Sequence, residues 1–433
     1  MLHLFHTADW HLGQTFHGYD RDYEHARFLE WLLTALVEHR PDALLLAGDV
    51  FDSINPSAQA QRRFYDFLKC AHQALPHLQC VITAGNHDAA SRLEAPSALL
   101  STLHINVIGT VPRDASGVID PTRFVIPLKN AEGKVEALAL AVPFLRPADV
   151  PMLPGSSDPY LEGIKELYRL ATEAAVALRD AHYPGAAIVA LGHCHLAGGE
   201  ASKDSERPLI IGGSESLKPD TFPAPLAYVA LGHLHKPQSI DEGRIRYCGS
   251  PIPLSFSEKN YKHQVLHVTL DGGGVRSAAP LFIPSTASLL RIPAQGALGV
   301  EPLLQEISGR DWNANLPAEQ HPFLEVHVLD EGPDPTRRNR IDAALAGKPV
   351  RLASMKLVPR QLDTSADDPG EPATAPLPDL NSLEPEELLH DTFVARYQKP
   401  PSPALLEALR EVLLAEATAE PSTAAPGAPS TPR

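Results

Sequence analysis

The sequence predicts a layered α/β fold. Five short apolar runs have the length and composition of buried strands, and each of them leads into a polar motif rich in Asp, Asn or His. Stretches in which apolar residues recur at helical spacing lie between these runs. Strands that alternate with helices are typical of layered α/β domains. The chain has 433 residues, of which 43% are hydrophobic, and this is enough for a sizeable core and for two or three domains.

Three of the predicted strands, residues 2–5, 43–47 and 80–84, lead into carboxylates, an amide and imidazoles. They are followed by Asp9-Trp10-His11, by Gly48-Asp49-Val50-Phe51-Asp52 and by Gly85-Asn86-His87-Asp88. Each motif alone is also compatible with an ordinary capped turn or with the start of a helix. Their joint occurrence, each after an apolar strand, favours a shared site.

Two further strands end in near-copies of one hexapeptide. Residues 190–195 read Ala-Leu-Gly-His-Cys-His and residues 230–235 read Ala-Leu-Gly-His-Leu-His. Residues i and i+2 of an extended segment point the same way. We therefore expect the segments around Asp9 and His11, and around His233 and His235, to be extended. Each pair would then face one site.

Ligands of open α/β sheets gather beyond the carboxyl ends of the strands, so these scattered side chains can converge there. Oxygen and imidazole ligands without an obligatory thiolate suit Mn²⁺, Fe²⁺ or Zn²⁺. Seven or eight candidate ligands are more than one ion needs. Two ions roughly 3.5–4 Å apart need a bridging carboxylate, and they can clamp an in-line displacement at phosphorus. Asp49 is the candidate for that bridge.

The series of motifs resembles the signature of the calcineurin-like metallophosphoesterases. That signature runs Asp-x-His, Gly-Asp-x-x-Asp, Gly-Asn-His-Asp/Glu, a lone His and Gly-His-x-His, and every element is present. Residues 11–13, 48–52 and the decapeptide 247–256 are similar, more narrowly, to the double-strand-break repair nucleases of this superfamily. The resemblance implies a layered α/β metallophosphoesterase sandwich.

The resemblance also implies a ligand set for two divalent metal ions, with Mn²⁺ expected. One ion would be held by Asp9, His11, Asp49 and His235, and the other by Asp49, Asn86, His193 and His233. The family has a single histidine where this chain has two. We favour His193, because it follows a glycine as His233 does, and His195 stays the alternative.

The catalytic side chain that the resemblance implies is His87, which would contact the scissile phosphate and protonate the leaving oxygen. Asp52 is placed like the acid that orients this histidine in related phosphatases, and a carboxylate partner would favour the imidazolium. A water molecule activated by the metal ions would be the nucleophile, so no serine or cysteine nucleophile is required.

The chain is expected to contain five segments. Residues 1–280 form the phosphoesterase domain, with helices near 22–40, 57–75 and 161–182. Residues 281–362 combine a strand near 323–328 with a helix near 334–346 and form a small α+β capping domain. Residues 363–382 are rich in Pro, Asp, Ala and Thr and are predicted to be a flexible linker. Residues 418–433 are a low-complexity tail, predicted to be disordered.

Residues 383–417 carry two short amphipathic patterns that are too small for a core of their own. They could form a hairpin on this protein's own surface. The resemblance favours docking on a coiled-coil ATPase subunit in the helix-in-groove manner. The nuclease subunit would be a dimer within a heterotetramer.

Composition sets limits on partners and compartment. The net charge is −16, and residues 361–433 alone hold thirteen Asp/Glu against four Lys/Arg, so DNA affinity of this chain by itself should be modest. No apolar run is long enough to span a membrane, and the start lacks the pattern of a signal peptide. Four cysteines without Cys-x-x-Cys spacing are typical of reduced thiols. We expect a cytoplasmic protein.

The resemblance therefore implies a two-metal nuclease subunit in DNA repair, recombination and replication. It would act as an exonuclease on double-stranded ends and as an endonuclease on single strands and hairpins, with ATP used by the partner. Two alternatives are a small-molecule phosphodiesterase or phosphatase, and a metal-free scaffold. Protein phosphatases of this superfamily continue Gly-Asp-x-x-Asp with Arg-Gly, whereas Ser53-Ile54 follow here. A scaffold should have lost ligands, and none is missing.

Overall fold

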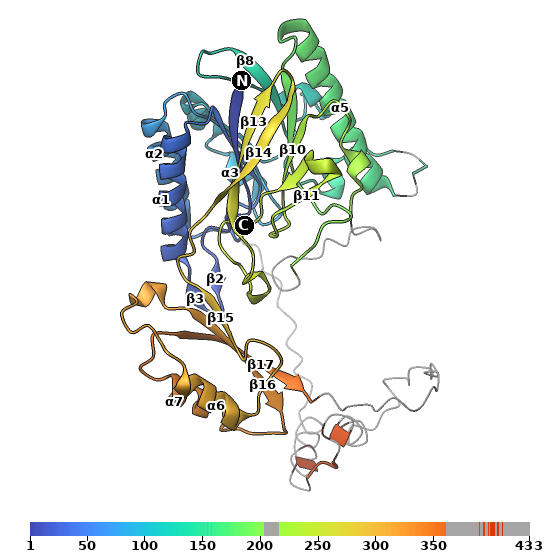
Figure 1. Ribbon diagram of the computed structural model, residues 1–433. Helices are drawn as coiled ribbons and strands as arrows, with labels where there is room; N and C mark the ends of the chain where they lie inside the picture. Colours follow the sequence, from blue (N-terminus) through green and yellow to red (C-terminus); the bar gives the residue numbers. More distant parts are fainter. Residues whose placement is uncertain are drawn as a thin grey trace, which may run out of the picture. The chain divides into compact units, whose positions relative to one another are not determined.

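The computed structural model describes residues 1–153, 155–156, 158–202 and 216–360, and isolated positions between 389 and 409. It divides into two compact units (Figure 1). The first unit comprises residues 1–290, 312–325 and 347–354, and the second comprises residues 291–311, 326–346 and 355–433. None of the described helices combines the length and the apolar character that crossing a membrane requires.

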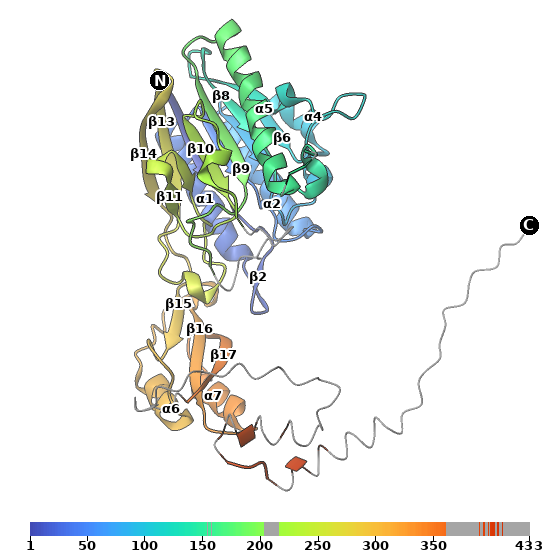
Figure 2. The same cartoon turned by 90° about the vertical axis from the view of Figure 1, so that its right-hand side faces the viewer.

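The first unit contains two six-stranded sheets. The first sheet has the order β14-β13-β1-β4-β5-β6. Its central strands β1 (Leu2–Thr7), β4 (Ala43–Ala47), β5 (Gln79–Thr83) and β6 (Ile105–Ile108) are parallel. Strands β13 (Gln264–Asp271) and β14 (Gly274–Phe282) continue the sheet in antiparallel pairing, and β14 is its edge (Figure 2).

The second sheet has the order β11-β12-β10-β9-β8-β7. Parallel pairing joins β8 (Val135–Ala141), β9 (Ala187–His193), β10 (Tyr228–Gly232) and β12 (Ile245–Tyr247). The edge strands β7 (Val125–Lys129) and β11 (Gln238–Ile240) are antiparallel to their neighbours. Strands that are buried on both faces are nearly all apolar, and β4, β9 and β10 follow this rule.

The two sheets are packed face to face between layers of helices. One apolar cluster joins Leu4 and Leu45 of the first sheet to Val189 and Ala230 of the second. Helices α1 (Asp22–His39) and α2 (Ala58–Ala74) cover the outer face of the first sheet, and α5 (Pro159–His182) covers that of the second (Figure 1). The predicted layered α/β fold is confirmed, and α1, α2 and α5 lie within two residues of the predicted helix limits.

Shorter elements complete the first unit. The hairpin of β2 (Thr15–Phe16) and β3 (Tyr19–Asp20) follows the first polar motif, and the helices α3 (Ala90–Glu94) and α4 (Ser97–Leu100) follow the third.

The region after residue 287 is smaller and combines strands with helices. Strands β15 (Leu289–Ile292), β16 (Phe323–Asp330) and β17 (Arg351–Pro359) form a three-stranded sheet, accompanied by α6 (Val300–Gly309) and α7 (Arg337–Leu345). Strand β16 and helix α7 lie where a strand and a helix are predicted, whereas α6 has no counterpart in the sequence analysis. The predicted linker, 363–382, and tail, 418–433, lie outside the described residues. So does the segment 383–417, except at isolated positions.

Candidate metal centre

Five parallel strands deliver the predicted ligands to one place. Strand β1 leads to Asp9 and His11, β4 to Asp49, and β5 to Asn86 and His87, while β9 ends at His193 and β10 leads to His233 and His235. The carboxyl ends of parallel strands share one edge of a sheet, so face-to-face packing of two such sheets brings both sets together. The contacts below show that these side chains meet.

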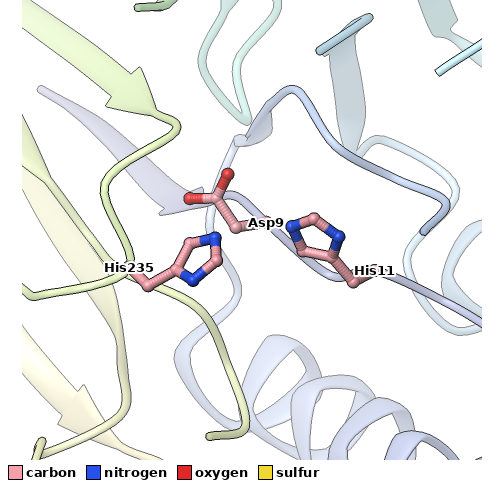
Figure 3. A group of neighbouring side chains, drawn as sticks. All are labelled: Asp9, His11 and His235. Atoms are coloured by element: carbon pink, nitrogen blue, oxygen red, sulfur yellow. The ribbon is translucent and has the colours of Figure 1, made fainter. Parts of the chain in front are cut away.

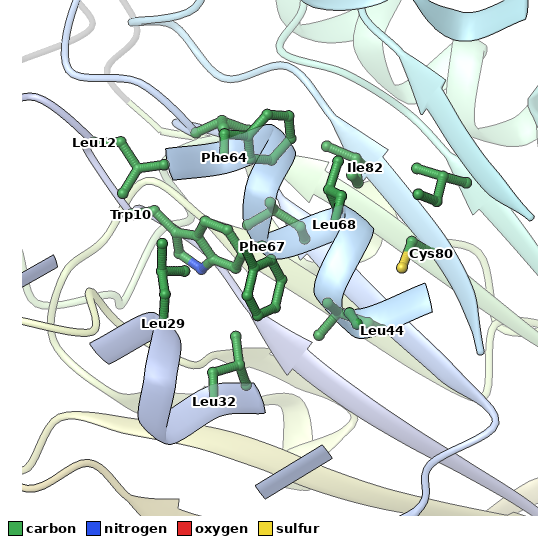
Figure 4. Packing of buried hydrophobic residues seen from close by; sticks show 14 of the residues in the cluster. Trp10, Leu12, Leu29, Leu32, Leu44, Phe64, Phe67, Leu68, Cys80 and Ile82 are labelled. Carbon is green, nitrogen blue, oxygen red and sulfur yellow. The ribbon is translucent and has the colours of Figure 1, made fainter. Parts of the chain in front are cut away.

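The loop after β1 is held by a buried tryptophan. Trp10 packs in the helix-covered core, with its ring centroid 5.5 Å from that of Phe28 in α1 and 5.4 Å from that of Phe67 in α2 (Figure 4). Its Nε1 donates a hydrogen bond of 2.9 Å to Thr7 Oγ1. The flanking side chains of Asp9 and His11 reach the candidate site instead.

The local backbone differs from the extended segments that the sequence analysis expects. Asp9, His11, Asp49 and His233 have φ angles of 55°, 44°, 49° and 99°. Asp and His tolerate the left-handed region better than most residues, yet such positions still cost on the order of 1–3 kcal/mol each. Tight turns therefore set the direction of these side chains. The alternation of side chains along an extended strand does not. Strain of this kind clusters at functional sites.

The first group of candidate ligands consists of Asp9, His11 and His235 (Figure 3). One ligand atom from each lies within 4.8 Å of the others, and all three residues are buried. Within the described residues, Asp9 Oδ2 is buried without a hydrogen-bond partner, and the ring nitrogens of His11 make no hydrogen bond of good geometry to the carboxylates of Asp49 and Asp52 beside them. Such atoms are costly to bury unless something binds them, and a cation would satisfy the carboxylate oxygen and an imidazole nitrogen together.

The second group consists of Asp9, Asp49 and His193. Asn86 joins it, because its Oδ1 lies 2.9 Å from His193 Nε2 and 3.2 Å from His233 Nδ1. The Nδ1 atom of His193 faces the carbonyl oxygen of Ala47 at 3.0 Å, which leaves Nε2 toward the site. Hydrogen bonds of this kind fix the tautomer and orientation of a metal-binding histidine.

Asp49 belongs to the second group and also lies beside His11 of the first group. Its Oδ2 lies 3.4 Å from His11 Nε2 and also 3.4 Å from His193 Nε2. Its Oδ1 accepts a hydrogen bond of 2.8 Å from the backbone N–H of His87. One oxygen of the Asp49 carboxylate thus lies between an imidazole of each group, as a bridging ligand would.

Glycines make the close approach of these loops possible. A Cβ on Gly85 would lie 2.1 Å from Asp49 Oδ1, and one on Gly48 would lie 2.2 Å from His193 Nδ1. Asp88 ties the loops together, because its buried carboxylate accepts backbone hydrogen bonds from Val50, Phe51 and Gly85. Asp88 has no role predicted from the sequence, because this contact between distant loops leaves no local signal.

The charges of the site are strongly perturbed. Burial raises the pKa of Asp9 to about 7, although His193 and His235 oppose the shift. Burial opposes ionisation of Asp49 as well, but His193 and His11 outweigh it and lower the pKa of Asp49. Burial also works against a charged His193, yet Asp49 raises the pKa of His193 to about 9. For His11 and His233, burial dominates and lowers the pKa. Oxygen and imidazole donors of this kind fit divalent cations such as Mn²⁺, Fe²⁺ and Zn²⁺.

His87 and Asp52 are neighbours, but they meet through a different atom from the one expected. The Nδ1 atom of His87 lies 2.7 Å from the backbone carbonyl oxygen of Asp52. The Asp52 carboxylate instead lies 3.3 Å from His11 Nδ1. Burial would raise the pKa of Asp52, and His11 outweighs this and lowers it. The imidazole of His87 is thus oriented by a carbonyl group, and the carboxylate serves His11.

The second histidine of the first hexapeptide lies farther out. The ring centroid of His195 is 6.4 Å from that of His233, and His195 belongs to neither ligand group. It lines a small cavity of about 40 Å³ with Tyr160, Tyr168 and Leu217. The geometry therefore favours His193 over His195 as a ligand, and the assignment itself stays a prediction.

A buried glutamate that the sequence analysis did not identify supports the site. Glu258 Oε1 lies 3.0 Å from His235 Nδ1, and its other oxygen accepts a hydrogen bond of 2.8 Å from the N–H of Leu254. Glu258 is fully buried at the end of a short 3₁₀ turn, Phe256–Glu258. Its neighbours Ser257 and Lys259 are polar, so the local sequence reads as surface and gives no signal of this contact.

Comparison with known protein families agrees with this architecture. Residues 2–237 match the calcineurin-like phosphoesterase family. Residues 287–397 match a family described as the type 5 capsule protein repressor C-terminal domain, whose short name is SbcD_C.

Curated relatives cover most of the chain, and three of them are named as the SbcD component of the nuclease SbcCD. The protein of Rhodobacter capsulatus is 42% identical over 395 residues, which are 90% of this chain and 94% of the relative. That of Escherichia coli K12 is 34% identical over 66% of this chain and 69% of the relative. That of Bacillus subtilis is 34% identical over 76% of this chain and 80% of the relative. With these matches, the chain belongs to the SbcD family of calcineurin-like phosphoesterases.

Proposed function

We propose that this chain is the nuclease subunit of an SbcC–SbcD-type complex and hydrolyses DNA phosphodiesters at two divalent metal ions. It belongs to a family of metal-dependent hydrolases, and its relatives are named as nucleases. The observation that carries the proposal is the position of Asp49 Oδ2, 3.4 Å from an imidazole nitrogen of each ligand group. A shared carboxylate oxygen is what a two-metal phosphoesterase requires.

The proposed ligand sets are those that the family resemblance implies. Asp9, His11, Asp49 and His235 would hold one ion, and Asp49, Asn86, His193 and His233 would hold the other. We propose Mn²⁺ for both positions, because carboxylate, amide and imidazole donors suit it. The ions supply charge stabilisation at phosphorus and lower the pKa of water.

His87 is proposed as the acid that protonates the leaving oxygen. Its Nδ1 faces the Asp52 carbonyl oxygen and its backbone N–H donates to Asp49, so the ring is held beside the proposed bridge. In the reaction, water forms the new P–O bond and loses a proton to solvent, the bond to the 3′ or 5′ oxygen breaks, and that oxygen takes a proton from His87, which is reprotonated from solvent. Asp52 acts as a positioning residue in this account, through its carbonyl group.

DNA is the proposed substrate, with exonuclease action on double-stranded ends and endonuclease action on single strands and hairpins. The relatives' name supports a nuclease, and Ser53-Ile54 replace the Arg-Gly that protein phosphatases of the superfamily carry. Roles in DNA repair, recombination and replication belong to this proposal.

The proposed partner is an SbcC-type coiled-coil ATPase, bound through residues 383–417. The relatives' name refers to a complex of two kinds of subunit, which supports such a partner. A dimer of the nuclease subunit within a heterotetramer is part of the proposal. A DNA substrate is consistent with the cytoplasmic location that the sequence predicts.

The test compares substrates under one set of conditions. The purified chain with Mn²⁺ is given linear double-stranded DNA, hairpin DNA and a phosphomonoester, with and without the ATPase subunit, beside an Asp49→Ala control. We expect DNA cleavage that requires Asp49 and little monoester hydrolysis. Good monoester turnover without DNA cleavage, even with the partner present, would identify a phosphatase instead.

A further inference from the structure

An exposed aromatic ring with a lysine over it stands at the edge of the first sheet. The side chain of Phe282, the last residue of β14, is 54% exposed, which is unusual for so large an apolar group in this structure. The ammonium group of Lys262 lies 5.8 Å from the centroid of the Phe282 ring. We call these two residues the Lys262–Phe282 platform.

The platform lies at the carboxyl end of β1, the same end of the sheet's parallel strands as the candidate metal centre. Phe282 pairs with Gln264 at the start of β13, and Leu266 of β13 pairs with His6 near the end of β1. The end of β1 leads directly to Asp9 and His11. Since β14 is two strands from β1, the platform stands about 10 Å to the side of that end. Figures 1 and 2 both show β13 and β14 side by side.

Two cavities meet at the platform, and Lys262, Phe282 and Tyr261 line both. The first, of about 410 Å³, extends to Lys236, the residue that follows the candidate ligand His235. Among its described lining residues are three cations, Lys236, Arg246 and Lys262, and no carboxylate. The cavity therefore joins the metal-site loop to the platform through a basic surface.

The second cavity, of about 430 Å³, adds Lys259 and Arg21. Its two carboxylates, Glu24 and Glu258, are buried and already engaged, Glu24 with Arg21 and Glu258 with His235. Lys236 is paired with Glu200. In the part of the chain that the structure describes, neither Lys259 nor Lys262 has a carboxylate within ion-pair distance. In a protein of net charge −16, these two lysines form a local site for an anion.

We propose that the Lys262–Phe282 platform binds the single-stranded part of the DNA substrate, with a base stacked on Phe282 and the adjoining phosphates at Lys262 and Lys259. This inference rests on the proposed function and assigns residues to it. Basic grooves with exposed aromatic rings are how proteins hold single strands without reading sequence. A duplex keeps its base faces stacked on one another, so the ring selects unpaired nucleotides.

The offset from the end of β1 gives the platform a purpose. The offset of about 10 Å between Phe282 and the end of β1 corresponds to about three nucleotides at the 3.4 Å spacing of one DNA strand. A base held on Phe282 would therefore hold a frayed end or a hairpin loop beside the ions.

The experiment measures binding and cleavage by the full chain with Mn²⁺. Binding is followed with fluorescent oligothymidylate and with blunt duplex DNA, and the metal centre is checked with bis(p-nitrophenyl) phosphate. The variants are Phe282→Ala, Phe282→Trp and Lys262→Ala. Matched controls are Leu99→Ala, whose side chain is 70% exposed, and Lys129→Ala, on the edge strand β7 of the other sheet.

We expect Phe282→Ala to weaken oligothymidylate binding roughly tenfold and Phe282→Trp to preserve it, because base stacking needs only an aromatic face. Lys262→Ala should make the plot of log K for oligothymidylate binding against log salt concentration shallower. The slope should change by about 0.7, the value for one phosphate of a single strand. Blunt-duplex binding, ester hydrolysis and both controls should stay at the wild-type level.

Unchanged oligothymidylate binding by Phe282→Ala would overturn the platform, and so would an equal loss for the blunt duplex. If the wild-type chain cuts DNA and Phe282→Ala cuts it equally well, the platform fails while the proposed function stands. If Phe282→Ala loses oligothymidylate binding but the wild-type chain cuts no DNA even with the ATPase subunit added, the platform stands and the nuclease proposal fails. A wild-type chain that neither binds nor cuts DNA, with or without the ATPase subunit, contradicts both.

Discussion

The Nδ1 atom of His235 lies 3.0 Å from Oε1 of Glu258, and both side chains are buried. This contact directs the other ring nitrogen of His235 toward Asp9 and His11. A carboxylate in this position fixes the orientation of a ligating histidine and increases its basicity. Glu258 therefore supports the metal centre as a positioning residue.

Glu258→Ala should weaken metal binding by about 10–100-fold, the usual effect of losing such a partner. Glu258→Gln keeps an acceptor oxygen and should retain most of the affinity. Isothermal titration with Mn²⁺ measures both, with Glu132→Ala as an exposed carboxylate control and circular dichroism to verify folding. Equal affinities for the wild-type chain and a folded Glu258→Ala variant would show that His235 needs no such support.

The two histidines of the first hexapeptide should differ in their effect on metal content. His193 Nε2 lies 3.4 Å from Asp49 Oδ2, whereas His195 lies outside both ligand groups. We expect His193→Ala to lose one ion per chain and His195→Ala to keep both, measured by elemental analysis after desalting. The opposite pattern would make His195 the ligand.

His87 is expected to act on the leaving group and not on the metal ions. His87→Gln should lower kcat for DNA by about 10²–10⁴-fold, the usual contribution of general acid catalysis, with the metal content unchanged. Hydrolysis of bis(p-nitrophenyl) phosphate should fall much less, because nitrophenolate leaves without a proton. An equal loss on both substrates would argue for a role of His87 in binding the phosphate instead.

His6 should make folding stability depend on pH. It is buried between Tyr228 Oη and the Leu231 carbonyl oxygen, and burial lowers its pKa to about 3 from 6.5. His6 therefore binds a proton below pH 6.5 in the unfolded chain, but only below about pH 3 in the folded chain. The contribution of His6 to the free energy of unfolding is fully present above pH 6.5 and is lost as the pH falls toward 3.

Between pH 7 and pH 5 the loss from His6 alone is on the order of 2 kcal/mol. Urea unfolding of the metal-free chain at both pH values should therefore show a steeper decline for the wild type than for His6→Gln. The difference between the two chains isolates His6 from the other histidines. Parallel curves would mean that His6 accepts a proton in the folded chain.

Much of the fold could be predicted because it depends on local signals. Helix α1 begins at Asp22, the predicted start, and α2 begins at Ala58, one residue after the predicted start, with Ser57 as its N-cap. Apolar periodicity and capping residues are properties of neighbouring residues, so the sequence carries them. The pairing of β1 with β13 and the face-to-face packing of two sheets depend on contacts between distant residues, and no local pattern encodes them.

The candidate site shows the same limit more sharply. Its candidate ligands could be named because Asp, His and Asn follow strands in a recognised series. The role of Glu258 could not, because its partner His235 is 23 residues away and its own neighbours are polar. The Asp52 carboxylate points to His11, and the Asp52 backbone carbonyl group faces His87. Side-chain rotation and loop conformation set these orientations. The sequence contains the residues but not these orientations.

The most direct test of the two-metal centre concerns Asp49. Elemental analysis of the Mn²⁺-loaded chain is compared with Asp49→Asn, and DNA cleavage is measured on the same samples. Two ions per wild-type chain, one or none per folded variant, and no cleavage by the variant are the results that a bridging Asp49 predicts. A variant that retains two ions and cuts DNA at the wild-type rate would contradict the account.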